Sequence, residues 1–122
     1  MIVAGFGFSS AANVASLRSA FEAASAGFNI DALATAVDKE GHAALAGFTD
    51  LTALPVHFID LSDLAGQRTL TCSARSRASY GTGSVAEAAA LAAAGRGARL
   101  TSPRHISQDR LATCAVAIGG QT

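Results

Sequence analysis

The chain has no tryptophan, one tyrosine and six phenylalanines, so few aromatic rings are available to stack on the bases of single-stranded nucleic acid. It also has no excess of charge of either sign, because nine lysines and arginines balance nine aspartates and glutamates. Nucleic-acid-binding proteins usually carry a large basic excess. The sequence therefore argues against nucleic acid as a partner.

Cysteines and long apolar segments are also scarce. Cys72 and Cys114 are far apart and do not cluster with the three histidines, so they match neither a disulfide framework nor a zinc site. The N-terminus lacks the basic start of a signal peptide, and no stretch is long enough to span a bilayer. We expect a cytoplasmic protein that binds no membrane and requires no metal or other cofactor.

The composition is that of a folded domain. Half of the 122 residues are hydrophobic and 15% are charged, which is too apolar for a disordered chain. A chain of this length can bury enough surface to fold as one unit, and no linker or repeat divides it. We therefore expect one domain over residues 1–122. Alanine is abundant, which favours helices with small faces that pack closely.

Apolar runs and amphipathic segments alternate along the chain. The predicted strands cover residues 1–5, 33–37, 55–60, 99–101 and 112–118. The predicted helices cover residues 11–26, 40–48 and 85–94, with a helical turn at 61–64 and no assignment for the polar segment 66–80. This order predicts an α/β fold, a single three-layer α/β/α sandwich with a mixed, mostly parallel sheet of about five strands. The last two strands are expected to pair in the antiparallel direction.

Ligands gather at the carboxyl ends of the strands in such sheets, and three loops are expected there: 5–10, 38–39 and 80–84. In the first loop Gly5 and Gly7 allow a tight turn, and Ser9 or Ser10 can cap the helix that follows. A plain turn and an anion-binding loop are equally compatible with this segment. The third glycine of a dinucleotide fingerprint and the Gly-Lys-Ser/Thr of a P-loop are both missing.

The loop before the helix at 85–94 contains a second candidate site. Ser84 and Glu87 have the spacing of a capping box, in which Ser84 accepts from the N3 amide and Glu87 reaches back. Thr82, Gly83 and Ser84 also present donors to an anion at the positive end of a helix. Capping is the favoured explanation for Glu87, whereas Thr82 and Ser84 suit either role.

The balanced charge conceals an uneven distribution along the chain. Residues 1–64 hold two cations and seven acids, and residues 65–122 hold seven arginines and two acids, giving formal charges of −5 and +5. This asymmetry suggests that the second half meets an anion. Lys39 is the only lysine and follows the second predicted strand, while Arg75, Arg77, Arg104 and His105 are further donors. Exposed ion pairs contribute only about 0–1 kcal/mol each, so useful affinity requires several cations acting on one polyanion.

These arguments select nine candidate ligand-binding residues and no catalytic residue. They are Gly5, Gly7, Ser9, Lys39, Thr82, Gly83, Ser84, Glu87 and Arg104.

Four segments together resemble one known family from end to end of the chain. They are Gly5-x-Gly7, Asp38-Lys39, GSVAEAAAL at 83–91 and ATCAVA at 112–117. The chain is similar to the CobE/CbiG C-terminal domain family of cobalamin (vitamin B12) biosynthesis, in particular to its stand-alone CobE proteins. The resemblance implies an α/β/α sandwich that binds precorrin-type tetrapyrrole polycarboxylates, as an accessory or carrier for the precorrin methyltransferases. Phe6 and Phe8 are candidates for contact with the macrocycle, although at least one is expected in the core.

Two alternatives remain open. The resemblance also implies a lactone-opening hydrolase related to cobalt-precorrin-5A hydrolase, which releases acetaldehyde. Such an enzyme needs a general base and an oxyanion donor, for which Glu87 and either Lys39 or the glycine-rich amides are the candidates. The second alternative is a small phosphate- or nucleotide-binding module that uses both glycine-rich loops. The sequence leaves the oligomeric state and the particular intermediate open.

Overall fold

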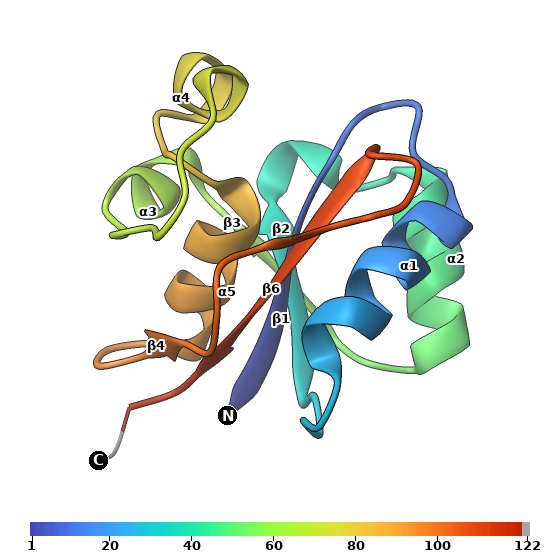
Figure 1. The fold of residues 1–122 in the computed structure, drawn as a ribbon, viewed down its shortest axis with the longest axis horizontal. Coiled ribbons are helices and arrows are strands. Elements are labelled where there is room, and N and C mark those ends of the chain that lie inside the picture. Colours follow the sequence, from blue (N-terminus) through green and yellow to red (C-terminus); the bar gives the residue numbers. More distant parts are fainter. Residues whose placement is uncertain (121–122) are drawn as a thin grey trace.

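The computed structural model of the chain describes residues 1–120. Its sheet is built around β1 (Ile2–Phe8), the first strand of the chain. On one side β1 pairs in parallel with β2 (Ala32–Ala36), and on the other it pairs antiparallel with β6 (Ala112–Ile118). The order across the sheet is β3-β2-β1-β6-β4. The N-terminal strand therefore holds the centre of the fold (Figure 1).

The outer strands are short. β3 (Val56–Ile59) is parallel to β2 and forms one edge. β4 (Arg99–Leu100) and β5 (His105–Ile106) pair antiparallel with opposite ends of β6. The mixed, mostly parallel sheet and the antiparallel pairing of the last strands are confirmed. The two-residue strand β5 was not predicted, because so short a segment has no periodicity of its own.

Helices cover both faces of the sheet (Figure 1). α1 (Val14–Ser25) and α2 (Ala43–Thr52) lie on one face, and α5 (Val85–Ala94) and α3 (Leu61–Ala65) lie on the other. The three-layer α/β/α architecture is confirmed. Within residues 1–120, every helix is too short or too polar to cross a membrane.

The first strand is longer than predicted. β1 continues through Gly7 to Phe8, whereas the sequence pattern predicted its end at Gly5. The extension is stabilised by β6, which pairs with β1 along its whole length up to Phe8↔Ala112. Because this pairing partner comes from the far end of the chain, the local sequence did not reveal it. The expected tight turn at the start of a helix is consequently absent from residues 5–8.

The cap of α1 also differs from the prediction. Asn13 is the N-cap, in place of Ser9 or Ser10. Its side chain accepts from the Ser16 amide at 3.0 Å, and the Ser16 hydroxyl accepts from the Asn13 amide at 3.2 Å. This reciprocal capping box satisfies two N–H groups at once and fixes Val14 as the first helical residue.

Two other segments differ from the prediction, and the last helix agrees with it. The second helix was predicted at 40–48, but a 3-10 turn, η1 (Val37–Lys39), follows β2, and α2 begins only after the His42 N-cap. The unassigned segment 66–80 contains α4 (Ala74–Tyr80), which ends at Gly81. The predicted helix 85–94 is confirmed at both ends as α5, with Gly95 as its C-cap.

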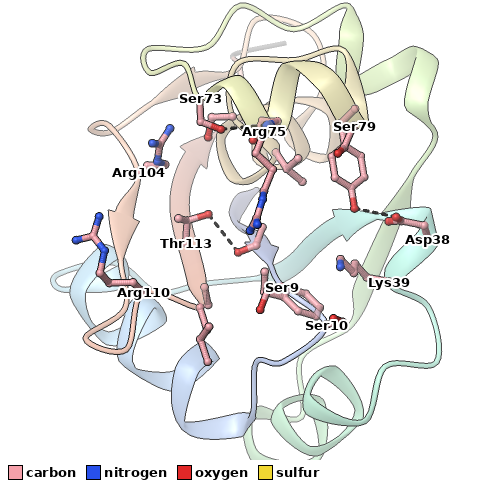
Figure 2. Close-up of a pocket in the computed structure, with 18 residues that line it drawn as sticks. Ser9, Ser10, Asp38, Lys39, Ser73, Arg75, Ser79, Arg104, Arg110 and Thr113 are labelled. Atoms are coloured by element: carbon pink, nitrogen blue, oxygen red, sulfur yellow. Dashed lines mark hydrogen bonds between the residues drawn. The ribbon is translucent and has the colours of Figure 1, made fainter.

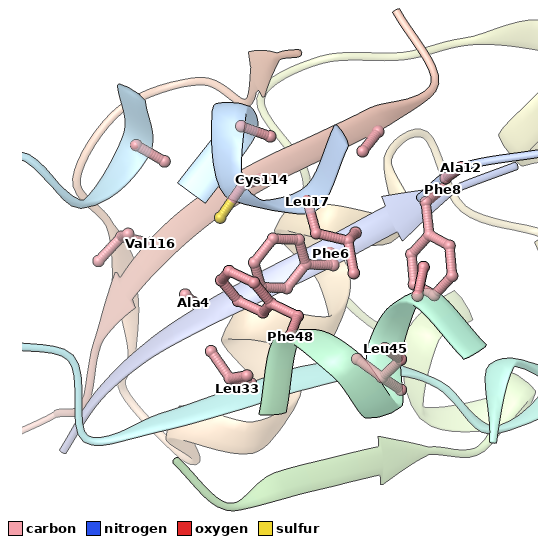
Figure 3. Packing of buried hydrophobic residues seen from close by; sticks show 14 residues of the cluster. Ala4, Phe6, Phe8, Ala12, Leu17, Leu33, Leu45, Phe48, Cys114 and Val116 are labelled. Atoms are coloured by element: carbon pink, nitrogen blue, oxygen red, sulfur yellow. The ribbon is translucent and has the colours of Figure 1, made fainter. Parts of the chain in front are cut away.

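The core between the sheet and α1/α2 is built on aromatic rings (Figure 3). Phe6 is fully buried, and its ring centroid lies 5.5 Å from that of Phe48 in an edge-to-face arrangement. Phe21 lies 5.3 Å from Phe48 and stacks on Phe6, while Leu17 is fully buried in the same cluster. Phe6 is thus a core residue and does not line a surface pocket.

On its other face β1 presents Val3, Gly5 and Gly7, and α5 lies directly on the two glycines. A Cβ at Gly5 would lie within 2.6 Å of the Ala90 amide nitrogen and closer still to the Ala86 carbonyl oxygen. A Cβ at Gly7 would be 3.3 Å from that of Val85. Glycine on the strand and alanine on the helix therefore permit an unusually close approach of the two backbones. This contact explains the alanine-rich sequence of α5.

We predict that Gly5→Ala destabilises the fold by about 3 kcal/mol, because the added methyl group meets backbone atoms that cannot move aside. Urea unfolding followed by circular dichroism measures this change. The matched control is Gly66→Ala, whose new Cβ would be 3.7 Å from its nearest neighbour. Equal stability of the two variants would contradict the close approach of α5 to β1.

Candidate functional site

A pocket of about 520 Å³ opens at the edge of the sheet where β1 and β2 end and β6 begins. Its walls come from Gly7–Ser10, η1, one side of α4, the first turn of α5 and the segment leading into β6 (Figure 2). The volume is typical of small-molecule sites, which measure about 300–1,000 Å³. The structure thus brings together parts of all three loops that the sequence placed at this edge.

The pocket is strongly cationic. Lys39, Arg75, Arg104 and Arg110 line it, together with a single acid, Asp38. Figure 2 shows Arg104 and Arg110 on one side, Lys39 on the opposite side, and Arg75 extending from α4 toward the middle. The ion pair formed within residues 1–120 joins two exposed residues of α1, so in this part of the chain the pocket cations form no ion pair and Asp38 offsets only one of their four charges. Such a site attracts anions.

Phe8 provides an apolar surface next to Lys39. The Lys39 Nζ lies 5.2 Å from the centroid of the Phe8 ring, a cation–π distance. The Phe8 ring also forms a T-shaped contact with His42, with ring centroids 5.1 Å apart. His42 Nδ1 accepts from the Ala44 amide, so its Nε2 carries the proton and donates to the Ser10 carbonyl at 3.0 Å. His42 thereby holds the loop after β1 in place at the rim.

Asp38 is engaged by Tyr80 across the pocket. The Tyr80 hydroxyl donates to Asp38 Oδ2 at 2.8 Å and so connects the end of α4 to η1. Burial, followed by the hydrogen bond and the negative charge of Asp38, raises the pKa of Tyr80 to about 12. The phenol therefore remains a hydrogen-bond donor at every physiological pH.

α4 forms an outer wall of the pocket and carries a stripe of hydroxyl groups. Ser73, Ser76 and Ser79 are spaced by three residues and all line the pocket. The Ser73 hydroxyl accepts from the Ser76 amide at 3.0 Å and caps the helix, while the Ser73 amide donates to the Gly83 carbonyl. None of the residues of α4 is buried. The helix is consequently held at its two ends and not by a core of its own.

The first turn of α5 forms the inner wall. Ser84 and Val85 line the pocket, and the Ser84 hydroxyl accepts from the Glu87 amide at 3.3 Å. The reciprocal bond of the predicted capping box does not form. The Glu87 carboxylate turns instead to the backbone N–H groups of Leu70, Thr71 and Arg104, which cover this part of the helix.

Five of the nine candidate residues lie at the pocket, and four do not. Those at the pocket are Gly7, Ser9, Lys39, Ser84 and Arg104. Gly5 lies beneath α5, and a Cβ at Gly83 would lie 2.6 Å from the Thr71 carbonyl oxygen, so both serve close packing. Thr82 is buried, and its hydroxyl has no hydrogen-bond partner among residues 1–120. Glu87 is fully enclosed by protein.

The sequence reasoning missed several pocket residues, of which Arg110 is the most important. Arg110 has a positive φ of 65° in the turn just before β6. Because β6 runs antiparallel to β1, its beginning lies at the same edge as the end of β1. The predicted antiparallel pair joined only the last two strands, so the pairing of β6 with β1, which brings Arg110 and Thr113 to the pocket, was not predicted. The three-residue spacing of serines at 73, 76 and 79 was an available signal for α4.

Residues 2–117 match the protein family described as Cobalamin synthesis G C-terminus. The chain belongs to this family. A crystal structure of CobE, a protein from the cobalamin (vitamin B12) biosynthetic pathway, is 34% identical, with a TM-score of 0.84 over 96% of this chain and 89% of that one. The cobalamin biosynthesis protein ChiG from Agrobacterium tumefaciens is 31% identical, with a TM-score of 0.76 over 99% of this chain and 100% of that one. No curated protein matches the sequence.

The match to the Cobalamin synthesis G C-terminus family confirms the resemblance that we inferred from the sequence. It identifies the chain as a member of a cobalamin biosynthesis family and agrees with the observed α/β/α fold. Membership of this family suggests tetrapyrrole intermediates of that pathway as the class of partner for the chain.

We predict that the single tyrosine titrates with a pKa of about 12, against an ordinary value of 10.0. Because the folded-state pKa is raised, the stability it contributes is complete below pH 10 and is lost as the pH rises toward 12. Phenolate absorbance measures the titration without interference, since the chain has no tryptophan. Asp38→Asn is expected to move the pKa part of the way back, and an unchanged value in that variant would contradict the Tyr80–Asp38 bond.

Proposed function

We propose that the chain binds anionic precorrin-type tetrapyrroles in this pocket and acts as an accessory or carrier protein in corrin ring synthesis. The observation that carries the proposal is the set of four pocket cations without a carboxylate partner in the described part of the chain. Unpaired cations facing one cavity favour a ligand that supplies several negative charges.

The positions of the cations suit such a ligand. A precorrin has an apolar macrocycle and carries acetate and propionate groups around its periphery. Lys39 faces Arg104 and Arg110 from the opposite side of the pocket (Figure 2), so carboxylates on different sides of one ring can be bound together. Guanidinium groups bind carboxylates in a bidentate manner. Phe8, Val85 and Leu111 provide apolar surface for the ring itself.

A lactone-opening hydrolase is less well supported by the same geometry. A general base must come within hydrogen-bond reach of its substrate. Glu87, the base considered from the sequence, is fully buried and its oxygens are already bonded to protein donors. Asp38 is the acid that does line the pocket, and it accepts the Tyr80 hydroxyl. Binding without chemical conversion therefore remains our proposal.

A nucleotide-binding module finds less support than a tetrapyrrole-binding protein. The glycine-rich segment 5–8 is a strand and not a phosphate-binding turn, and α1 is capped by its own Asn13. The start of α5 does lie at the pocket, so phosphate compounds serve as competitors in the binding test below.

The proposal also includes a location and protein partners. Both cysteines are free, with Cys72 exposed and Cys114 buried, which supports a reducing compartment such as the cytoplasm. A carrier must pass its ligand to enzymes of ring modification, and the precorrin methyltransferases are the proposed recipients.

We predict that Lys39→Ala combined with Arg104→Ala weakens tetrapyrrole binding by about tenfold or more, since two ion pairs of about 1 kcal/mol each are lost. Uroporphyrin, a stable tetrapyrrole with acetate and propionate side chains, serves as the probe, and its visible absorbance reports binding. The protein purified from cells that accumulate precorrins is expected to be coloured.

The matched control is Arg96→Ala combined with Arg99→Ala, which removes the same charge from exposed residues near β4, at the opposite end of the sheet. This variant is expected to bind as the wild type does. Equal weakening of both variants would show that net charge alone attracts the probe. Displacement of uroporphyrin by ATP or phosphate at similar concentration would favour the phosphate-binding alternative.

A further inference from the structure

Glu87 is the one carboxylate in residues 1–120 that is completely buried, and it accepts four hydrogen bonds. Oε1 accepts from the amides of Leu70 at 2.6 Å and Thr71 at 3.0 Å. Oε2 accepts from the Thr71 hydroxyl at 2.8 Å and from the Arg104 amide at 2.9 Å. All four donors lie at least 16 positions away in the sequence, so none belongs to the helix that carries Glu87.

The donors come from the two segments that lead into the pocket. One is the irregular segment between α3 and α4, which continues after Thr71 into the serine stripe and Arg75. The other is the connection between β4 and β5, and its contribution is Arg104 itself. The two segments are also joined to each other, because Arg104 Nη1 donates to the Thr71 hydroxyl. The Glu87 carboxylate therefore attaches both segments to α5, the one that leads to Arg75 and the one that contains Arg104.

Because Glu87 is buried, the loss of any of its hydrogen bonds is costly. A carboxylate removed from water requires its full set of donors, and leaving one unmet costs more than an ordinary hydrogen bond contributes. Within residues 1–120 no lysine or arginine forms an ion pair with Glu87, so neutral N–H and O–H groups hold the charge. These segments cannot move independently of α5 without depriving the Glu87 carboxylate of its hydrogen-bond donors.

Glu87 does not itself reach a ligand. It is absent from the lining of the pocket and has no exposed surface. Glu87 can therefore affect ligand binding only through the positions of Arg104 and of the segment that leads to Arg75.

We propose that Glu87 is a positioning residue of the ligand site, which sets the spacing of the pocket arginines for a ligand with several carboxylates. The inference rests on the proposed tetrapyrrole-binding function. It reassigns a residue whose sequence context suggested helix capping.

The test is Glu87→Gln, which keeps the shape of the side chain but replaces one acceptor oxygen with an NH₂ donor. Uroporphyrin affinity is expected to fall about tenfold, the equivalent of one hydrogen bond to a charged group. Coproporphyrin, in which methyl groups replace the acetates, should lose less. The ratio of uroporphyrin affinity to coproporphyrin affinity is therefore expected to be lower in Glu87→Gln than in the wild type, a change that a loss of stability alone does not produce.

A double-mutant cycle identifies the route of the effect. In an Arg104→Ala background, Glu87→Gln should weaken binding by a smaller factor than in the wild type, because one of the positioned cations is already gone. Leu91→Ala is the matched stability control, since Leu91 is buried one turn further along α5 and does not line the pocket. It is expected to lower the unfolding temperature and to leave uroporphyrin affinity unchanged.

Three outcomes overturn the proposal: wild-type affinity in folded Glu87→Gln, equal factors in both backgrounds, or the same loss of affinity in Leu91→Ala. If Glu87→Gln does not fold, Thr71→Val replaces it, because this change removes only the hydroxyl shared by Glu87 and Arg104. Wild-type affinity in Thr71→Val then overturns the proposal. A wild-type protein that binds no tetrapyrrole refutes the proposed function, whereas normal wild-type binding with an unaffected Glu87→Gln refutes only the positioning role.

Discussion

The close approach of α5 to β1 is the constraint on which the rest of the structure depends. Gly5 and Gly7 carry no side chain on the face of the central strand that meets α5, so the alanines of the helix pack against the strand backbone at these two positions. Because α5 packs so closely on β1, its first turn lies at the carboxyl edge of the sheet, where Ser84 and Val85 form a wall of the pocket. It also carries Glu87 into the interior, where only donors from other segments can satisfy it.

The pocket consequently has two kinds of wall. Phe8 is the last residue of β1 and is buried in the core, and Lys39 lies in η1 directly after β2, with His42 bracing the adjoining loop. Arg75 and Arg104 belong to segments that lack a core of their own and depend on polar attachments. Cations gathered in one cavity repel one another. An anionic ligand relieves this repulsion when it binds, and it thereby stabilises the folded arrangement of these segments.

The sequence was sufficient for the features that arise from local pattern. The alternation of strands and helices gave the architecture, and α5 was delimited correctly because Ser84 and Gly95 mark its ends. Features that depend on distant partners were not accessible in this way. β1 extends to Phe8 only because β6 pairs with it, and the donors to Glu87 come from segments that local spacing does not relate to it. In the same way, α4 has no apolar periodicity and exists through its caps and attachments.

The position of β1 also affects how the chain reaches its native state. The strand is synthesised well before β6, which completes one of its two edges, and Gly7 and Thr113 are 106 positions apart. Such nonlocal pairing slows folding, because a long loop must close before the contact stabilises anything. During synthesis the early strands therefore present an open, apolar edge on β1 that is able to pair with other chains. The arrival of β6 removes that hazard, and in the same step it closes the sheet and brings Arg110 to the rim of the pocket.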